Sequence, residues 1–179
     1  MPLFGKYATI IRQLLLIFFL VPLVSCGAKS PSLNVNVGEK VSDLNVKSLN
    51  GEDEVLSLKT GKVLIVNLWA TWCAPCRHEM PSLDRLSTLL DKTKFSVIGI
   101  SVDEDDHVAR EFLIERKVAF KNYLDPAMAV ANDIFGVRVF PSTFVISPDG
   151  ILLKVIEGWR DWDGSELVKE LEGFSIIIE

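Results

Sequence analysis

Two cysteines separated by two residues, Cys73 and Cys76, are the residues of this chain best suited to chemistry. They lie in the segment Trp72-Cys73-Ala74-Pro75-Cys76, between an apolar run of β type and an amphipathic helical pattern. At a helix N-terminus, unpaired backbone N–H groups and the positive end of the dipole stabilise a thiolate, the form of cysteine that attacks disulfides. The second cysteine, one turn further on, can close a ring with the first and release a bound partner. The spacing therefore predicts dithiol–disulfide exchange.

Three other uses of a Cys-x-x-Cys pair fit the sequence less well. A zinc site needs two more ligands, and the chain offers only His78 and His107 as histidines. Covalent haem attachment needs a His directly after the second Cys, whereas position 77 is Arg. A structural disulfide would close a very small loop, the kind that contributes least chain-entropy stabilisation. No metal is expected, and no nicotinamide or flavin motif occurs, so the dithiol itself would carry the electrons.

The N-terminal segment has the layout of an export signal. Lys6 and Arg12 precede an apolar run over residues 14–24, which is shorter than the roughly 20 residues of a membrane span. Leu23-Val24-Ser25-Cys26 resembles the lipobox of bacterial lipoproteins, in which cleavage leaves a lipidated N-terminal Cys, here Cys26. Two acyl chains are enough for stable anchoring. An uncleaved anchor helix and an ordinary signal peptide with an incidental Cys are the alternatives.

This interpretation divides the chain into three parts. We expect a lipoprotein-type signal peptide over residues 1–25, the lipidated Cys with a tether over 26–40, and one domain over 41–179. The net charge of −5, without a basic stripe, argues against a nucleic-acid partner. The expected location is extracytoplasmic and membrane-anchored, on the periplasmic or outer face. Because thiols tend to oxidise there, a functional dithiol must either use these oxidising conditions or be supplied with electrons.

Strand and helix patterns alternate through the rest of the chain and predict an α/β fold with a mixed central sheet. A hairpin around Asn50-Gly51 and a second across Pro148-Asp149-Gly150 are antiparallel, whereas the crossover from Val63 to Val102 implies a right-handed parallel pair. The expected strands are 41–49, 54–58, 63–69, 95–102, 120–124, 142–147 and 151–156. The expected helices are 74–91, 106–117, 126–135 and 164–172.

Two separated motifs carry a resemblance to a known family. They are Trp72-Cys73-Ala74-Pro75-Cys76 with Pro81 after it, and Phe140-Pro141-Ser142-Thr143-Phe144. With these, the chain from about residue 37 onward resembles the thioredoxin superfamily, and within it the membrane-anchored, extracytoplasmic branch often called TlpA/ResA/CcmG-like. The resemblance implies a thioredoxin-like three-layer fold with an N-terminal hairpin extension and a central insertion around residues 120–135. It also implies a protein-disulfide reductase or thiol:disulfide interchange protein.

The resemblance suggests that Glu79 handles a proton. It follows Cys76 by three residues, on the same helix face, and the extracytoplasmic branch carries a functional Glu at this place. Cytosolic thioredoxins instead use a buried Asp on the preceding strand, where this chain has Asn67, which cannot titrate. The alternative is that Glu79 is an ordinary surface carboxylate.

The resemblance also points to a substrate-binding rim. It implies that Pro141 is cis, faces the disulfide and exposes backbone groups to an extended substrate segment. A proline that merely starts a strand is the alternative. Phe140 would form an apolar lip, and Trp72 would shape the rim of the nucleophile or simply pack. Trp69 is expected in the sheet core.

Several other polar and aromatic residues carry weaker signals. The acidic run 103–106 predicts helix capping rather than a cation site. Arg77 either supports the thiolate or solvates the helix. Trp159 and Trp162 either pack or form a rim, and the sequence does not separate these roles.

The function that these features predict is a membrane-tethered thiol–disulfide oxidoreductase. Thiolate Cys73 would attack a disulfide of an exported protein, and Cys76 would then displace the reduced partner. A membrane thiol-electron donor would re-reduce the pair, and the resemblance suggests apocytochrome c among the substrates. The alternatives are a net oxidant, although Ala74-Pro75 lacks the His such proteins tend to carry, and a non-catalytic copper-handling or docking module.

Overall fold

The structure, a computed structural model, describes residues 35–176. The predicted signal peptide, the predicted lipidation site Cys26 and the first part of the tether lie outside the described residues. Within the described part, no helix combines the length and apolar character that a membrane crossing requires.

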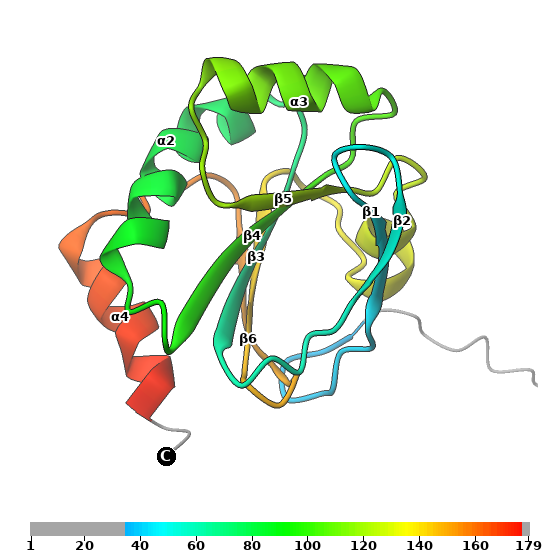
Figure 1. The fold of residues 1–179 in the computed structure, drawn as a ribbon. Helices are drawn as coiled ribbons and strands as arrows, with labels where there is room; N and C mark the ends of the chain where they lie inside the picture. The colour runs from blue at the N-terminus through cyan, green and yellow to red at the C-terminus, as the bar shows by residue number, and fades with distance from the viewer. Residues whose placement is uncertain (1–34, 177–179) are drawn as a thin grey trace, which may run out of the picture. The chain divides into compact units, whose positions relative to one another are not determined.

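A seven-stranded mixed sheet organises the described domain, in the order β2-β1-β5-β4-β3-β6-β7 (Figure 1). Its strands are β1 (Leu44–Lys47), β2 (Asp53–Leu56), β3 (Val63–Trp69), β4 (Phe95–Ser101), β5 (Lys121–Leu124), β6 (Ser142–Ile146) and β7 (Leu152–Glu157). The helices are α2 (Ala74–Leu89), α3 (Asp106–Glu115) and α4 (Ser165–Ile176), with a short π-helix η1 (Val130–Ile134). This is the predicted thioredoxin-like architecture, with β1 and β2 as the added N-terminal hairpin.

The pairing of the strands confirms the expected chain path. Strand β3 pairs parallel with β4 and antiparallel with β6, and β6 pairs antiparallel with β7. Every residue of β3 is buried, because this central strand is covered on both faces and flanked on both edges. The end of β3 therefore provides a rigid platform for the cysteine motif that follows it.

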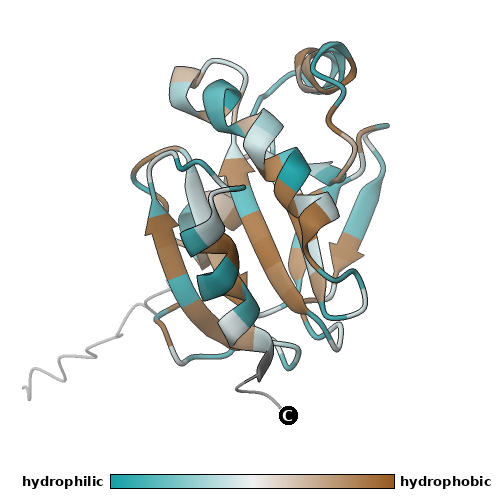
Figure 2. Cartoon of the chain, turned by 90° about the vertical axis from the view of Figure 1, so that its left-hand side faces the viewer, coloured by the Kyte–Doolittle hydropathy of each residue, from teal (hydrophilic) through white to brown (hydrophobic). Residues whose placement is uncertain are grey.

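Alternate residues of the sheet point to two different layers. On one face, Trp69 of β3 contacts Phe112 of α3, with ring centroids 5.4 Å apart. Helices α2 and α4 lie on this face (Figures 1 and 2), with their apolar stripes toward the brown strands. On the other face, Phe144 of β6 stacks on Phe135, directly after η1. The two faces give the three layers that the resemblance implied.

The central insertion differs in part from expectation. Strand β5 forms as predicted, but the helix expected over 126–135 is reduced to the short π-helical turn η1. Met128 has φ 54°, a left-handed conformation that a right-handed helix cannot contain, so the helical turn begins only after it. The buried carboxylate of Asp125 accepts the N–H of Ala131 at 2.9 Å and holds the turn. Residues 126–128 instead form a bend that connects β5 to the turn.

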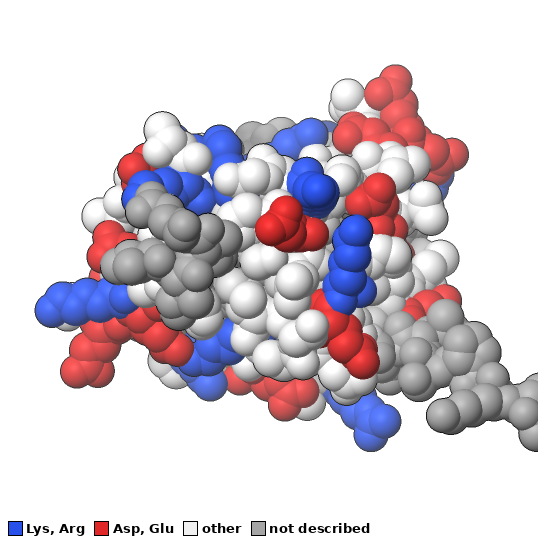
Figure 3. Space-filling model, turned by 90° about the horizontal axis from the view of Figure 1, so that it is seen from below, with Lys and Arg blue, Asp and Glu red and all other residues white. Residues whose placement is uncertain are grey.

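Charge is distributed without a dominant sign on the face seen in Figure 3. Acidic and basic side chains alternate there, and neither forms a continuous stripe. This distribution, with the net charge of −5, offers no electrostatic footprint for a nucleic acid on that face.

Candidate active site

Cys73 and Cys76 form a disulfide at the start of helix α2, with Cα atoms 5.2 Å apart. Cys73 is the N-cap residue, and its Sγ accepts the backbone N–H of Cys76 at 3.2 Å. Pro75 lies in the first turn, where its missing N–H leaves no bond unmade. Cys73 is 6% exposed and Cys76 is fully buried, so the order of accessibility is the predicted one. The helix N-terminus can therefore stabilise a thiolate at Cys73, the outer of the two sulfurs.

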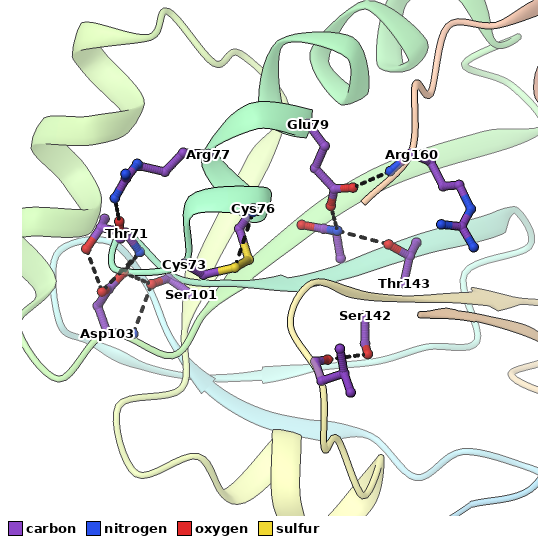
Figure 4. The surroundings of a disulfide bond; sticks show 12 residues. Thr71, Cys73, Cys76, Arg77, Glu79, Ser101, Asp103, Ser142, Thr143 and Arg160 are labelled. Carbon is purple, nitrogen blue, oxygen red and sulfur yellow. Dashed lines mark hydrogen bonds between the residues drawn. A yellow bond between two sulfur atoms is a disulfide. The ribbon is translucent and has the colours of Figure 1, made fainter. Parts of the chain in front are cut away.

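The loop before Cys73 is held by the buried carboxylate of Asp103, at the end of β4 (Figure 4). Asp103 accepts hydrogen bonds from the N–H of Thr71 at 2.9 Å, from its Oγ1 at 2.7 Å, and from Ser101 Oγ at 2.6 Å. Arg77 donates from its guanidinium to the carbonyl of Thr71 and so ties α2 to the same loop. These bonds fix the backbone that presents Cys73.

Glu79 lies on the opposite side of the disulfide from Asp103 in Figure 4 and is only 1% exposed. Its Oε1 accepts Asn67 Nδ2 at 2.8 Å. Its Oε2 accepts the backbone N–H of Arg160 at 3.0 Å and Trp162 Nε1 at 2.9 Å. Glu79 is therefore not a surface carboxylate, because strand β3 and the segment before α4 enclose it.

Burial raises the pKa of Glu79 above the usual value for a glutamate, because desolvation disfavours the charged form. The hydrogen bonds from Trp162, Arg160 and Asn67 act in the opposite direction, as does the positive charge of Arg160, but they do not cancel the desolvation. A carboxyl group of this kind can take up and release a proton closer to neutrality than an exposed one.

The segment around Phe140 and Pro141 contacts the cysteine motif through its aromatic residue. The rings of Trp72 and Phe140 meet edge to face, with centroids 5.7 Å apart. The Phe140–Pro141 peptide bond is cis, as the resemblance implied. Pro141 is buried and its carbonyl accepts the N–H of Gly158, whereas no hydrogen bond within residues 35–176 uses the backbone N–H or C=O of Phe140. Trp72 is 61% exposed, so the two aromatic rings form an accessible apolar rim.

The tryptophans that the sequence left open have different surroundings. Trp162 is fully buried and bonded to Glu79, whereas Trp159 is half exposed and meets His78 edge to face. The roles of Trp162 and of the Arg160 N–H were not predicted, and no local pattern signals them. The Thr71–Asp103 contact was also missed. The parallel register of β3 and β4 could have indicated this contact. Trp69 pairs with Ser101, and Thr71 and Asp103 each follow their strand's paired residue by two positions.

Comparisons with known proteins agree with this geometry. Residues 37–155 match the AhpC/TSA family, and the chain belongs to that family. It is 31% identical to the thiol-disulfide oxidoreductase ResA of Geobacillus thermodenitrificans, over 69% of this chain and 71% of ResA. A ResA of Bacillus thuringiensis is 27% identical over 82% of this chain and 90% of its own.

Solved structures give the same result. A protein of Chlorobium tepidum assigned as the thiol:disulfide interchange protein DsbE has a TM-score of 0.70 and 27% identity, covering 79% of this chain and 99% of its own. StoA of Bacillus subtilis is 20% identical with a TM-score of 0.61, over 73% of this chain and 96% of its own, and shares the fold. The chain is thus an enzyme of the thiol–disulfide oxidoreductase class, of ResA/DsbE type, and Cys73 and Cys76 are its only cysteines within residues 35–176.

Proposed function

We propose that the protein is a membrane-tethered, extracytoplasmic reductase of disulfides in exported proteins. The observation that carries the proposal is the unequal placement of the two sulfurs. Cys73 caps a helix at the rim, and Cys76 is buried one helical turn before the enclosed carboxyl group of Glu79. One sulfur is suited to meet a partner and the other to complete the exchange inside the protein.

The proposed reaction starts from the reduced dithiol. The Cys73 thiolate attacks one sulfur of the partner's disulfide, and the partner's other sulfur leaves as a thiolate that takes a proton from solvent. Glu79, ionised at this stage, accepts the proton of the Cys76 thiol. The Cys76 thiolate then attacks Cys73 Sγ, the partner's second thiolate leaves, and the protein keeps the Cys73–Cys76 disulfide. Two electrons have moved from the protein to the partner.

The rim is the proposed docking site for the partner chain. No group within residues 35–176 bonds the backbone N–H or C=O of Phe140, and its ring meets that of Trp72. An extended segment carrying a cysteine can pair with this backbone and rest on the two rings. Buried Pro141 holds the loop, since its carbonyl is engaged by Gly158.

The residues between the cysteines support the direction of electron flow. Ala74 and Pro75 place no cation between the two cysteines, so this dipeptide adds no charge to the stabilisation that the helix N-terminus gives the thiolate. We therefore expect a potential nearer that of thioredoxin, about −270 mV, than that of the strong oxidant DsbA, about −120 mV. A membrane thiol-electron donor would re-reduce the disulfide, and apocytochrome c is the substrate that the resemblance suggests.

The experiment combines a redox titration with a trapping variant. The Cys73–Cys76 couple is equilibrated with glutathione buffers, and Cys76→Ala is used to hold partners on Cys73 as mixed disulfides. A potential below about −200 mV and trapped exported proteins are expected. A potential above about −150 mV would make the protein a net oxidant, and copper retention without disulfide exchange would make it a metal-handling module.

The anchor is tested separately. Mass spectrometry of the purified protein should find a lipid-modified Cys26 at the N-terminus, together with fractionation to membranes. An unmodified Cys26 thiol would remove the tether from the proposal and leave the exchange chemistry as it stands.

A further inference from the structure

Trp159 and Arg160 follow strand β7 and connect two parts of the site. Before them, the N–H of Gly158 donates to the carbonyl of Pro141 at 2.8 Å. After them, the backbone N–H of Arg160 donates to Glu79 Oε2 at 3.0 Å (Figure 4). The backbone between the cis-proline loop and the buried carboxyl group is therefore fixed at both ends.

The side chains of these two residues nevertheless face solvent. The indole of Trp159 is 50% exposed, and it meets the ring of His78 edge to face, with centroids 5.1 Å apart. His78 lies on α2, two residues after Cys76. Arg160 is exposed as well. A tryptophan and an arginine on a fixed backbone beside a reactive disulfide have the composition of a protein-binding surface.

The guanidinium of Arg160 forms no ion pair within residues 35–176. It donates one hydrogen bond, to the carbonyl of Trp159 at 2.8 Å. A guanidinium presents five N–H donors in a planar fork that matches a carboxylate. The nearby first turn of α2 has no acidic residue, and Arg77 and His78 are exposed there. The charge of this surface is therefore complementary to an acidic partner.

A cavity of about 580 Å³ between β7 and α4 leaves room for such a partner beside Arg160. Its lining includes Leu167, Lys154 and Glu170, and the last two form an ion pair with each other. Glu157 also lines the cavity, and its negative charge disfavours a second carboxylate along β7. Arg160 is thus the place in this cavity where an acidic side chain is best accommodated.

We propose that Trp159 and Arg160 select disulfide partners that carry an acidic residue near the reactive cysteine. The partner segment that docks on Phe140 continues across Pro141, rests on the ring of Trp159 and places its carboxylate on the guanidinium of Arg160. Tryptophan and arginine are among the residues that contribute most binding energy at protein interfaces. This inference rests on the proposed exchange with protein disulfides and names the class of partner.

Docking of this kind also acts on Glu79. The positive charge of Arg160 lowers the pKa of Glu79, against the larger effect of desolvation, whereas the neighbouring Asn67 and Trp162 are neutral. A partner carboxylate on the guanidinium offsets that positive charge, so Glu79 binds a proton more readily while the partner is in place. This is the stage of the proposed reaction at which Glu79 accepts the proton of Cys76.

The test compares peptide disulfides that differ in a single residue, Glu or Gln, placed at successive positions on either side of the cysteine. At one position or more, kcat/KM for the acidic peptide should exceed that for the neutral one by about fivefold at low salt, the effect of a partly exposed ion pair. Arg160→Gln should abolish this preference. Arg116→Gln, which removes an exposed charge at the end of α3, should keep it. Equal rates for both peptides, or the same loss in both variants, would overturn the proposal.

A binding measurement separates this inference from the proposed function. The oxidised full chain, labelled with ¹⁵N, is titrated with the same peptides in which Ser replaces the cysteine, so that no exchange occurs. The Arg160 Nε–H resonance should shift with the acidic peptide and stay in place with the neutral one, whereas Trp159 Nε1–H should shift with both. An Arg160 resonance that ignores the acidic peptide would show that the docking site is wrong. If it shifts while the reduced protein exchanges no peptide disulfide, the proposed function fails and the docking site stands.

Discussion

Two buried carboxylates flank the disulfide, and they are built differently. Asp103 and Glu79 are 3% and 1% exposed. The Asp103 carboxylate accepts hydrogen bonds from two side-chain hydroxyl groups, those of Thr71 and Ser101. Both residues lie at or next to the ends of the paired strands β3 and β4. The donors of Glu79 come from β3 and from a segment about 80 residues further along the chain.

The difference shows how burial alone does not define what a carboxylate does. The bonds to Asp103 connect the ends of two strands and hold the loop that presents Cys73. Around Glu79, desolvation outweighs the hydrogen bonds and raises the pKa. One group is suited to position the cysteine and the other to exchange a proton with it.

The largest expected effect is on the rate of exchange in Glu79→Gln. Loss of the proton acceptor should slow resolution of the mixed disulfide by about 100-fold, the lower end of what general acid–base catalysis contributes. The dependence of the rate on pH that Glu79 produces should disappear. Stopped-flow reduction of a peptide disulfide over a range of pH measures both. A profile that superimposes on the wild type would leave proton transfer to water.

Asp103→Asn should lower the stability of the protein and leave the pH dependence of the exchange rate unchanged, the reverse of the pattern expected for Glu79→Gln. Replacing the charged acceptor weakens three hydrogen bonds, and we expect a loss of about 2 kcal/mol in the free energy of unfolding. The shape of the pH–rate profile should stay that of the wild type, because Asp103 takes no proton in the reaction. Urea unfolding and the stopped-flow assay test the two statements. A changed profile would mean that both carboxylates take part in proton transfer.

Trp162→Phe should change the titration of Glu79. It removes the Nε1–H that stabilises the ionised carboxylate, so the pKa of Glu79 should rise further and the rate profile should move to higher pH. Trp69→Phe is the matched control, since it also removes a buried indole N–H but one that bonds Asn122. Carboxyl resonances of labelled Glu79 measure the shift, and equal shifts in both variants would exclude a specific role for Trp162.

A smaller effect is expected on stability. The pKa of Glu79 is higher in the folded chain than its usual 4.5. Below that usual value both states are protonated, but as the pH rises the unfolded chain ionises first, and this ionisation stabilises the unfolded chain relative to the folded one. The oxidised wild type should therefore lose stability relative to Glu79→Gln between about pH 4 and about pH 7. Urea unfolding curves of both proteins at about pH 4 and about pH 7 measure this change in relative stability. The same stability difference between the two proteins at both pH values would mean that desolvation of the Glu79 carboxylate does not destabilise the folded chain.

The sequence was most informative where the structure is local. The Cys-x-x-Cys spacing, the apolar strand before it and the helix after it are adjacent in the chain, and all three form as predicted. The parallel pairing of β3 with β4 followed from the strand–helix–strand pattern, because a crossover through a helix brings the second strand back parallel to the first. The cis Phe140–Pro141 bond came from the resemblance alone, because an X–Pro bond adopts either form at modest cost.

The parts that were missed depend on long-range packing or on single backbone angles. Trp162 and Arg160 meet Glu79 only because the segment before α4 returns across α2, and no periodicity marks that contact. The shortened helix at η1 results from the left-handed conformation of Met128, which its residue type does not signal. The Glu79 site is therefore a product of tertiary structure, whereas the cysteine motif is a product of sequence.

The most direct test is a titration of the two thiols in the reduced protein, in the wild type and in Glu79→Gln, followed by NMR of labelled cysteines. A carboxylate beside Cys76 disfavours its thiolate and couples the two titrations. Removing the charge should lower the pKa of Cys76 and reduce its titration to a single step, with a smaller change at Cys73. Identical cysteine titrations in the two proteins would contradict the account, because Glu79 would then be buried beside the disulfide without influencing its chemistry.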